Sequence, residues 1–327
     1  MNRMDKSNTR VCVTGGSGYI GSWLVKNLLK KGYTVHATLR NLEDKAKVGL
    51  LQSLPNAETN LVLYQADIYN PDDFHAAING CEFSMWPHLC NMTPIASSIA
   101  DSCLRSKTVK RLIYTASVVA ASPLNKDGFL SKSCIDEDSW TSLDLSLTYG
   151  NDITREYTIA KTLAEMEVLR YNDEKLEVVT LACGLVGGET LLPHVPLSVE
   201  VIFSQVTGNV FGYYYGLKLM QELLGSVPLV HIEDVCEAHI FCMENPSITG
   251  RFLCAATSAT VRDIADYIQE SYPEFKIEDK FKGEEETGSI CDSSKLRKLG
   301  FDYKYDQKKI IDESFECGKR LGALPNQ

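Results

Sequence analysis

The residues Arg10-Val-Cys-Val-Thr-Gly-Gly-Ser-Gly-Tyr-Ile-Gly-Ser22 decide the fold of this chain. The stretch predicts a short buried strand, a glycine turn and the start of a helix. The first glycine would allow the tight turn, the second the close approach of a pyrophosphate, and the third the packing of helix on strand. The free N–H groups at such a helix start attract phosphate. The stretch therefore predicts a dinucleotide site rather than a purely structural turn. Its predicted contact residues are Gly15, Gly18, Tyr19, Ile20 and Gly21.

The next predicted strand, Thr34–Leu39, ends at Arg40. A site that prefers NAD usually has an acidic residue near this point, whereas an arginine suits the extra 2′-phosphate of NADP. Lys45 and Lys47 follow and could add positive charge. These residues favour NADP as the cofactor, and the alternative is a solvated basic loop.

Composition narrows the classes of protein. The chain has 327 residues and a formal net charge of −10, which argues against nucleic acid or an anionic membrane as the main partner. No apolar run reaches the roughly 18 residues of a spanning helix, and the polar N-terminus lacks a signal-peptide core. The eleven cysteines form no Cys-x-x-Cys pair, and the six histidines show no metal-ligand spacing. We therefore expect a cytoplasmic protein with reduced thiols and no metal.

Strand and helix signals alternate through the first half of the chain. Further strands are expected at Leu61–Tyr64, Arg111–Thr115 and Glu177–Leu181. This alternation predicts an α/β protein with a Rossmann-type, doubly wound parallel sheet. After residue 184 the sequence becomes richer in Gly, Pro and Tyr, which we interpret as a smaller C-terminal region that caps the substrate. The predicted NADP-binding domain is 10–183, with 227–248 returning to it, and the predicted substrate-binding region is 184–226 and 249–324.

A tyrosine and a lysine four residues apart form the catalytic candidate. Tyr157 and Lys161 lie in a predicted helix, where this spacing places both side chains on one face. A nearby ammonium lowers the pKa of a phenol, so the tyrosine could exchange a proton with a substrate oxygen. Ser117 follows a strand end and could hydrogen-bond the same oxygen. Thr115 or Ser122 could take that role instead.

These motifs resemble those of the extended short-chain dehydrogenase/reductases, and most closely the plant dihydroflavonol reductase and anthocyanidin reductase group. The resemblance covers the chain from Arg10 to Leu324. The segments that carry it are Thr14–Gly21, Ala37–Arg40, Gln65–Ile68, Thr115–Ser117, Tyr157–Lys161, Leu181–Gly188, Pro228–Val235 and Gly250–Cys254.

The resemblance implies an NADPH-dependent reductase, a monomer or homodimer, that acts on a carbonyl or related unsaturated centre of a flavonoid-like substrate. It implies these roles: Arg40 and Lys47 at the 2′-phosphate, Asp67 and Ile68 near the adenine, Tyr157 and Lys161 as the proton relay, Cys183 to Val186 along the nicotinamide, and Ser204 near the cofactor. The loops 118–138 and 191–223 would shape the substrate pocket, where Trp140 and the run Tyr213–Tyr215 could stack on an aromatic ring.

One stretch departs from the family pattern. The family has a strand that ends in a motif like His-Val-Ala-Thr-Pro, followed by a long helix, whereas this chain reads Glu82-Phe-Ser-Met-Trp-Pro-His-Leu-Cys-Asn-Met-Thr-Pro94. If the strand end were lost, the glycine turn would lose its neighbour and hold the cofactor loosely. A degenerate isoform with weak or no activity is therefore one alternative. A nucleotide-sugar epimerase is another, and its second nucleotide would need basic residues such as Arg251 and Arg262.

Overall fold

The computed structural model describes residue 6 and residues 8–87, 93–207, 215–277, 279–281 and 288–325. The chain packs as two compact units. The first consists of Met1–Ala116, Leu163–Leu181 and Cys236–Arg251, and the second of Ser117–Thr162, Ala182–Val235 and Phe252–Gln327. Each unit is described by itself.

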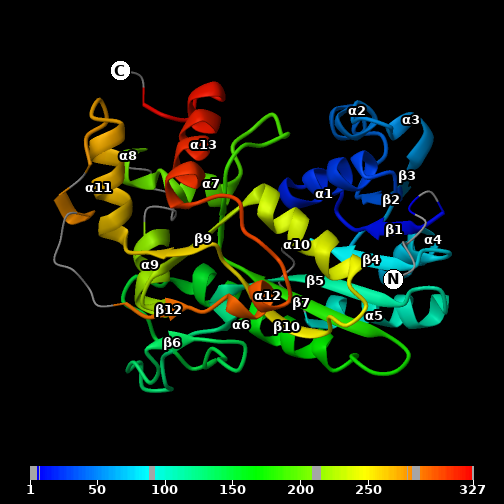
Figure 1. Cartoon of the computed structure of the whole chain (residues 1–327), viewed down its shortest axis with the longest axis horizontal. Helices are drawn as coiled ribbons and strands as arrows, with labels where there is room; N and C mark the ends of the chain where they lie inside the picture. Colours follow the sequence, from blue (N-terminus) through cyan, green and yellow to red (C-terminus); the bar gives the residue numbers. More distant parts are fainter. Residues whose placement is uncertain are drawn as a thin grey trace. The chain divides into compact units, whose positions relative to one another are not determined.

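A seven-stranded sheet forms the centre of the first unit, with the strand order β10-β7-β5-β4-β1-β2-β3 (Figure 1). Its strands are β1 (Arg10–Val13), β2 (Thr34–Leu39), β3 (Leu61–Gln65), β4 (Phe83–Trp86), β5 (Arg111–Ser117), β7 (Glu177–Cys183) and β10 (Gly250–Cys254). β1 runs parallel to β2 and β4, β2 to β3, and β4 to β5. Strands covered on both faces are apolar throughout, and Val11, Cys12 and Val13 are indeed fully buried.

Helices cover both faces of this sheet. The elements concerned are α1 (Tyr19–Lys30), α2 (Lys45–Gln52), α3 (Ala57–Asn60), the 3₁₀ turn η1 (Pro71–Asp73), α4 (Phe74–Ile78), α5 (Thr93–Ser106), α6 (Asp152–Leu169) and α10 (Ile232–Glu244). α10 lies beside α1, since Lys31 pairs with Glu237 at 3.0 Å. α5 lies beside α6, since Ser97 donates to Glu167 at 3.1 Å. Figure 1 draws the first pair above the strands and the second below. The predicted doubly wound sheet is confirmed.

Strand β4 is present where the sequence suggested that a strand end could be missing. Phe83, Ser84 and Met85 pair with β1, and β4 pairs with β5 on its other side. The backbone N–H of Thr14 donates to the carbonyl of Met85 at 3.0 Å, so the glycine turn keeps its neighbour. The strand end that the sequence suggested could be lost is therefore present, because four buried residues complete the ladder with β5. Residues 88–92 lie outside the described residues.

The second unit contains two smaller sheets. β8 (Leu185–Gly187), β9 (Val227–His231) and β11 (Thr257–Ala259) have the order β11-β9-β8, and β6 (Cys134–Ile135) runs parallel to β12 (Ile290–Cys291). Its other helical segments are η2 (Val118–Ala120), α7 (Leu197–Ile202), α8 (Ser204–Thr207), α9 (Gly216–Leu224), α11 (Val261–Ser271), η3 (Asp279–Phe281), α12 (Ser294–Lys298) and α13 (Gln307–Arg320). Thr260 and Asp263 form a capping box at the start of α11, as their spacing predicts.

Three general properties concern the described part of the chain. No helix there combines the length and the apolar character that crossing a membrane requires. No group of three or more His, Cys, Asp or Glu side chains there is arranged to hold a metal ion. The described cysteines are all free thiols, and all of them except Cys134 are buried.

Candidate active site

The glycine turn between β1 and α1 has the geometry of a phosphate-binding loop. Gly15 has a φ of +61°, which L side chains rarely adopt. Its N–H donates to Oγ1 of Thr38 at 3.0 Å. A Cβ on Gly21 would lie 2.3 Å from the carbonyl oxygen of Gly15, so the helix can approach the turn only without a side chain there. The glycine turn approaches strand β2 most closely at Gly16, where an added Cβ would lie 2.9 Å from Cβ of Ala37.

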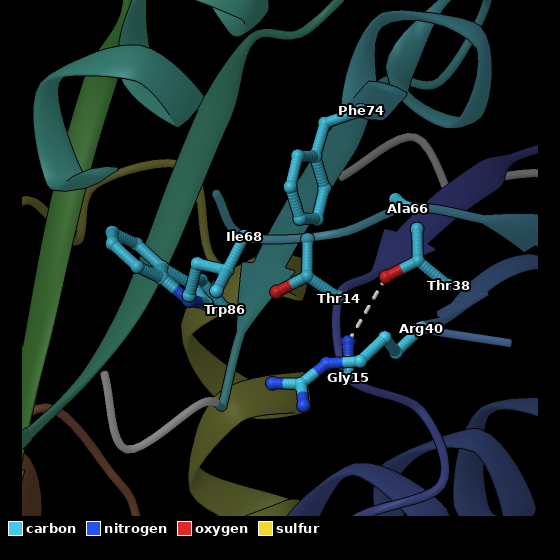
Figure 2. Close-up of a pocket in the computed structure, with 8 residues that line it drawn as sticks. All are labelled: Thr14, Gly15, Thr38, Arg40, Ala66, Ile68, Phe74 and Trp86. Carbon is cyan, nitrogen blue, oxygen red and sulfur yellow. Dashed lines mark hydrogen bonds between the residues drawn. The ribbon is translucent and has the colours of Figure 1, made fainter. Parts of the chain in front are cut away.

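A pocket opens at the carboxyl ends of four neighbouring strands, β4, β1, β2 and β3 (Figure 2). Its lining residues are Thr14, Gly15, Thr38, Arg40, Ala66, Ile68, Phe74 and Trp86. Ligands of doubly wound sheets bind at this edge of the strands. The predicted residues Gly15, Arg40 and Ile68 therefore come together in one pocket.

The charged groups around the pocket suit an anion. The side chain of Arg40 is 67% exposed, and its Nε lies 3.8 Å from a carboxylate oxygen of Asp67. This long, exposed pair holds the guanidinium weakly. Lys47 lies one helical turn into α2 and pairs with Asp44 at 3.3 Å. The backbone N–H of Asp67 donates to Asp73 at 3.0 Å, which fixes the loop after β3.

One buried polar atom in the pocket has no partner among the described residues. Oγ1 of Thr14 is buried and accepts or donates no hydrogen bond there, although the residue is only 1% exposed. Figure 2 shows this hydroxyl turned into the space between Trp86 and Arg40. A buried polar group of this kind is costly unless a ligand or water satisfies it. Together with the glycine turn and Arg40, it shows that the residues present fit the phosphate groups of a nucleotide.

The second unit holds the proton-transfer candidates. The side chain of Ser117 lies close enough to the hydroxyl of Tyr157 to lower its pKa. Ser117 is the last residue of β5 rather than a residue beyond it, and its oxygen also accepts from the N–H of Val119 at 3.4 Å. Lys161 follows Tyr157 by one turn of α6 and is fully buried. The predicted grouping of a serine and a tyrosine hydroxyl is therefore present.

The pKa of Tyr157 differs from the expectation. Burial raises the pKa of its hydroxyl above the ordinary value of 10.0, and the hydrogen bond from Ser117 opposes this shift only in part. The net shift is thus upward, opposite to the lowering that a nearby ammonium would cause, because desolvation of the phenol is the larger effect. Tyr157 therefore retains its proton at neutral pH.

The alternatives to Ser117 have other partners. Oγ1 of Thr115 lies 2.7 Å from Nε2 of His239. The hydroxyl of Ser122 donates to the carbonyl of Leu223 at 2.5 Å. Both are buried and serve packing between segments distant in sequence, which favours Ser117 for the role at the substrate oxygen.

The remaining predicted site residues lie in, or next to, the helices and strands described above. Cys183 ends β7 and Val186 is central in β8, and both are buried. Ser204 begins α8 and donates to the carbonyl of Val201 at 2.7 Å. Tyr19 and Ile20 begin α1, and Gly18 is its N-cap residue. Tyr213 and Tyr214 lie outside the described residues.

The sequence did not assign five of the lining residues, Thr14, Thr38, Ala66, Phe74 and Trp86. Thr14 and Thr38 sit at the ends of β1 and β2, where the position in the parallel sheet was a usable signal. Phe74 and Trp86 gave no such signal, since an aromatic residue at an apolar position is most often part of a core.

Comparison with known proteins places this fold in a family. The model of the NAD dependent epimerase/dehydratase family matches residues 11–252. An anthocyanidin reductase ((2S)-flavan-3-ol-forming) of Vitis vinifera is 36% identical, over 96% of this chain and 96% of its own length. A dihydroflavonol 4-reductase of Dianthus caryophyllus is 35% identical, over 99% and 91%.

A solved structure agrees with these sequences. The crystal structure of vestitone reductase from alfalfa (Medicago sativa) superposes with a TM-score of 0.79 and 34% identity, covering 96% of this chain and 99% of that one. The chain belongs to the NAD dependent epimerase/dehydratase family. Within that family it is similar over nearly its whole length to plant reductases of the extended short-chain type.

Proposed function

We propose that this chain is an NADPH-dependent reductase of a carbonyl, or a related unsaturated centre, on a flavonoid-like substrate. The observation that carries the proposal is the placement of Tyr157 on α6, one turn before the buried Lys161 and near Ser117 at the end of β5. The full-length similarity to anthocyanidin and dihydroflavonol reductases supports the substrate class.

The first unit would hold the cofactor. The start of α1, at Tyr19, Ile20 and Gly21, would face the pyrophosphate, and the turn at Gly15 and Gly18 would let it approach the backbone closely. Arg40 binds the 2′-phosphate with Lys47 in support, because a guanidinium matches phosphate oxygens in pairs. Asp67 and Ile68 lie at the adenosine end. We assign Cys183 and Val186 to the nicotinamide end, Ser204 to a position near the cofactor, and residues 10–183 with 227–248 to cofactor binding.

The second unit would supply the proton. NADPH provides a hydride when it is bound. Ser117 donates a hydrogen bond to the substrate oxygen and draws electron density toward it. Tyr157 gives its proton to the same oxygen as negative charge develops there. Lys161 stabilises the resulting phenolate and orients the cofactor ribose. Residues 184–226 and 249–324 enclose the aromatic substrate.

Two rival functions lose support. An epimerase would need basic residues for a second nucleotide, but Arg251 is 5% exposed and paired with the buried Glu165 at 3.0 Å. The other candidate, Arg262, pairs along α11 with Asp266 at 3.4 Å. A degenerate isoform was suggested by the loss of a strand, and β4 is complete.

Cell location and assembly follow as lesser proposals. The free, buried cysteines suit a reducing compartment, so we place the protein in the cytoplasm. Its negative net charge gives no reason to expect nucleic acid or anionic membrane as a partner. Monomer and homodimer stay open, and sedimentation of the purified chain decides between them.

The test is NADPH consumption with a panel of dihydroflavonols, anthocyanidins and isoflavanones, with simple aromatic ketones as controls. Tyr157→Phe should keep the fold and NADPH binding but lower turnover about 10²-fold or more. Tyr171→Phe, a tyrosine just after the end of α6, is the matched control and should keep turnover. Undiminished turnover in Tyr157→Phe would remove the tyrosine from the reaction, and no turnover with any flavonoid carbonyl would refute the substrate class.

A further inference from the structure

Trp86 lies in the cofactor pocket of the first unit. It is the last residue of β4, and the pairing of Val13 with Met85 places it beside Thr14 at the carboxyl edge of the sheet. Figure 2 shows its indole next to Ile68, across the pocket from Arg40. An aromatic side chain therefore occupies the edge of the sheet at which the adenosine half of a dinucleotide binds.

The indole is firmly packed in this position. Trp86 is 1% exposed, and its ring centroid lies 4.9 Å from that of the fully buried Tyr114 on β5. Most of the ring thus contacts protein, and only its rim borders the pocket.

The pocket that remains is small. Its cavity volume is about 50 Å³, which is room for a few water molecules. Sites for small molecules and cofactors usually measure roughly 300–1,000 Å³. The arginine and the glycine turn suit the phosphates, but the space beside Trp86 does not suit a purine and its ribose without movement.

We propose that Trp86 limits the affinity of this chain for the adenosine half of NADPH, because the rim of its indole narrows the small pocket at the edge of the sheet where that half would bind. The proposal rests on the proposed function, since it concerns the same cofactor. The cofactor then binds only to those molecules in which the indole has moved. The apparent affinity is therefore reduced in proportion to the fraction of molecules in that moved conformation. Trp86 is a specificity-determining residue for the cofactor and takes no part in the proton transfer.

The first experiment is calorimetric titration with adenosine 2′,5′-bisphosphate, which carries the adenosine half and no nicotinamide. Trp86→Leu and Trp86→Ala should bind it about tenfold more tightly than the parent chain, or about 1.4 kcal/mol. Phe83→Leu is the matched control, because Phe83 is a buried aromatic residue of the same strand that does not line the pocket. The control should lose thermal stability without a gain in affinity.

A second experiment does not depend on the stability of the Trp86 variants. The chain has three tryptophans, Trp23, Trp86 and Trp140. Trp23→Phe/Trp140→Phe leaves Trp86 as the only indole, and its emission should shift to longer wavelength as adenosine 2′,5′-bisphosphate saturates the site. An unchanged emission spectrum at saturation would show that the ligand does not disturb Trp86, which overturns the proposal.

The outcomes separate this proposal from the proposed function. Equal or weaker binding in folded Trp86→Leu overturns the role of Trp86, while turnover with NADPH in the parent chain leaves the reductase function intact. Tighter binding in Trp86→Leu, without turnover on any carbonyl, supports the role of Trp86 and counts against the reductase function. No binding of the probe or of NADPH in any variant overturns both.

Discussion

Removing the guanidinium of Arg251 should destabilise the protein by several kcal/mol. Its Nε donates to Oε1 of Glu165 at 3.0 Å and its Nη2 to Oε2 at 3.2 Å. The two side chains are 5% and 0% exposed. Arg251→Met would leave a buried carboxylate whose remaining donor includes the Thr180 hydroxyl at 2.7 Å. Breaking a buried pair by removing one partner costs about 3–5 kcal/mol, because the other charge stays buried without compensation.

The assay is urea unfolding followed by circular dichroism, with the free energy of unfolding extrapolated to water. Arg262→Met is the control, since its pair with Asp266 is exposed and should contribute less than about 1 kcal/mol. Glu165→Leu/Arg251→Met should recover most of the loss, because buried ion pairs can be replaced by apolar side chains at little cost. A loss below about 1 kcal/mol for Arg251→Met would refute the reasoning, and so would a double variant as unstable as the single one.

Three further predictions concern the cofactor turn and a buried histidine. Arg40→Asp should weaken the binding of NADPH by about 1.5–3 kcal/mol and the binding of NADH far less. If titrations with NADPH and NADH showed equal losses of affinity, Arg40 would not be the residue that binds the 2′-phosphate. Gly21→Ala places a Cβ 2.3 Å from the Gly15 carbonyl oxygen. It should lower the free energy of unfolding in urea by about 1–3 kcal/mol and should weaken NADPH binding. An unchanged stability would show that the turn has room for a side chain at this position. Burial lowers the pKa of His231 in the folded protein, despite its contact with Glu313. As the pH falls, His231 therefore takes up a proton more readily in the unfolded chain than in the folded one, so the free energy of unfolding should decrease below about pH 6.5. His231→Gln should flatten that slope in unfolding series at pH 5–8, and an unchanged slope assigns it to other groups.

The sequence predicts most of the cofactor-binding fold because its signals are local. Thr34–Leu39 is a strand with the predicted bounds, and the helix expected after the glycine turn runs from Tyr19 to Lys30. The parallel order follows from the alternation of strands and helices. The sequence does not predict very short strands such as β8, with three residues, and β12, with two. These strands form because partners distant in sequence pair with them, and their own residues carry no strand pattern.

The site could be predicted in part. The glycine spacing and the Tyr157/Lys161 pair are determined by helix and turn geometry, which a sequence displays directly. The fate of the stretch after Glu82 was misjudged for a physical reason: a central parallel strand needs only a short run of buried residues and a neighbour on each side, and Phe83–Trp86 meets both needs. The volume of Trp86 in the pocket was not predictable, because its direction depends on the register with β1.

The state of Tyr157 links the structure to the direction of the proposed reaction. A phenol whose pKa is raised by burial holds its proton at neutral pH and so can act as an acid. Reduction of a carbonyl consumes one proton at the oxygen, which a protonated tyrosine supplies. The reverse oxidation needs a base at the same position and therefore requires the phenolate, which burial makes costly. Ser117 lowers this cost in part, because its hydrogen bond stabilises the charge that Tyr157 acquires after the transfer. In the proposed reaction, Tyr157 would therefore give its proton first and Ser117 would then stabilise the resulting charge, which is the order that a reductase requires.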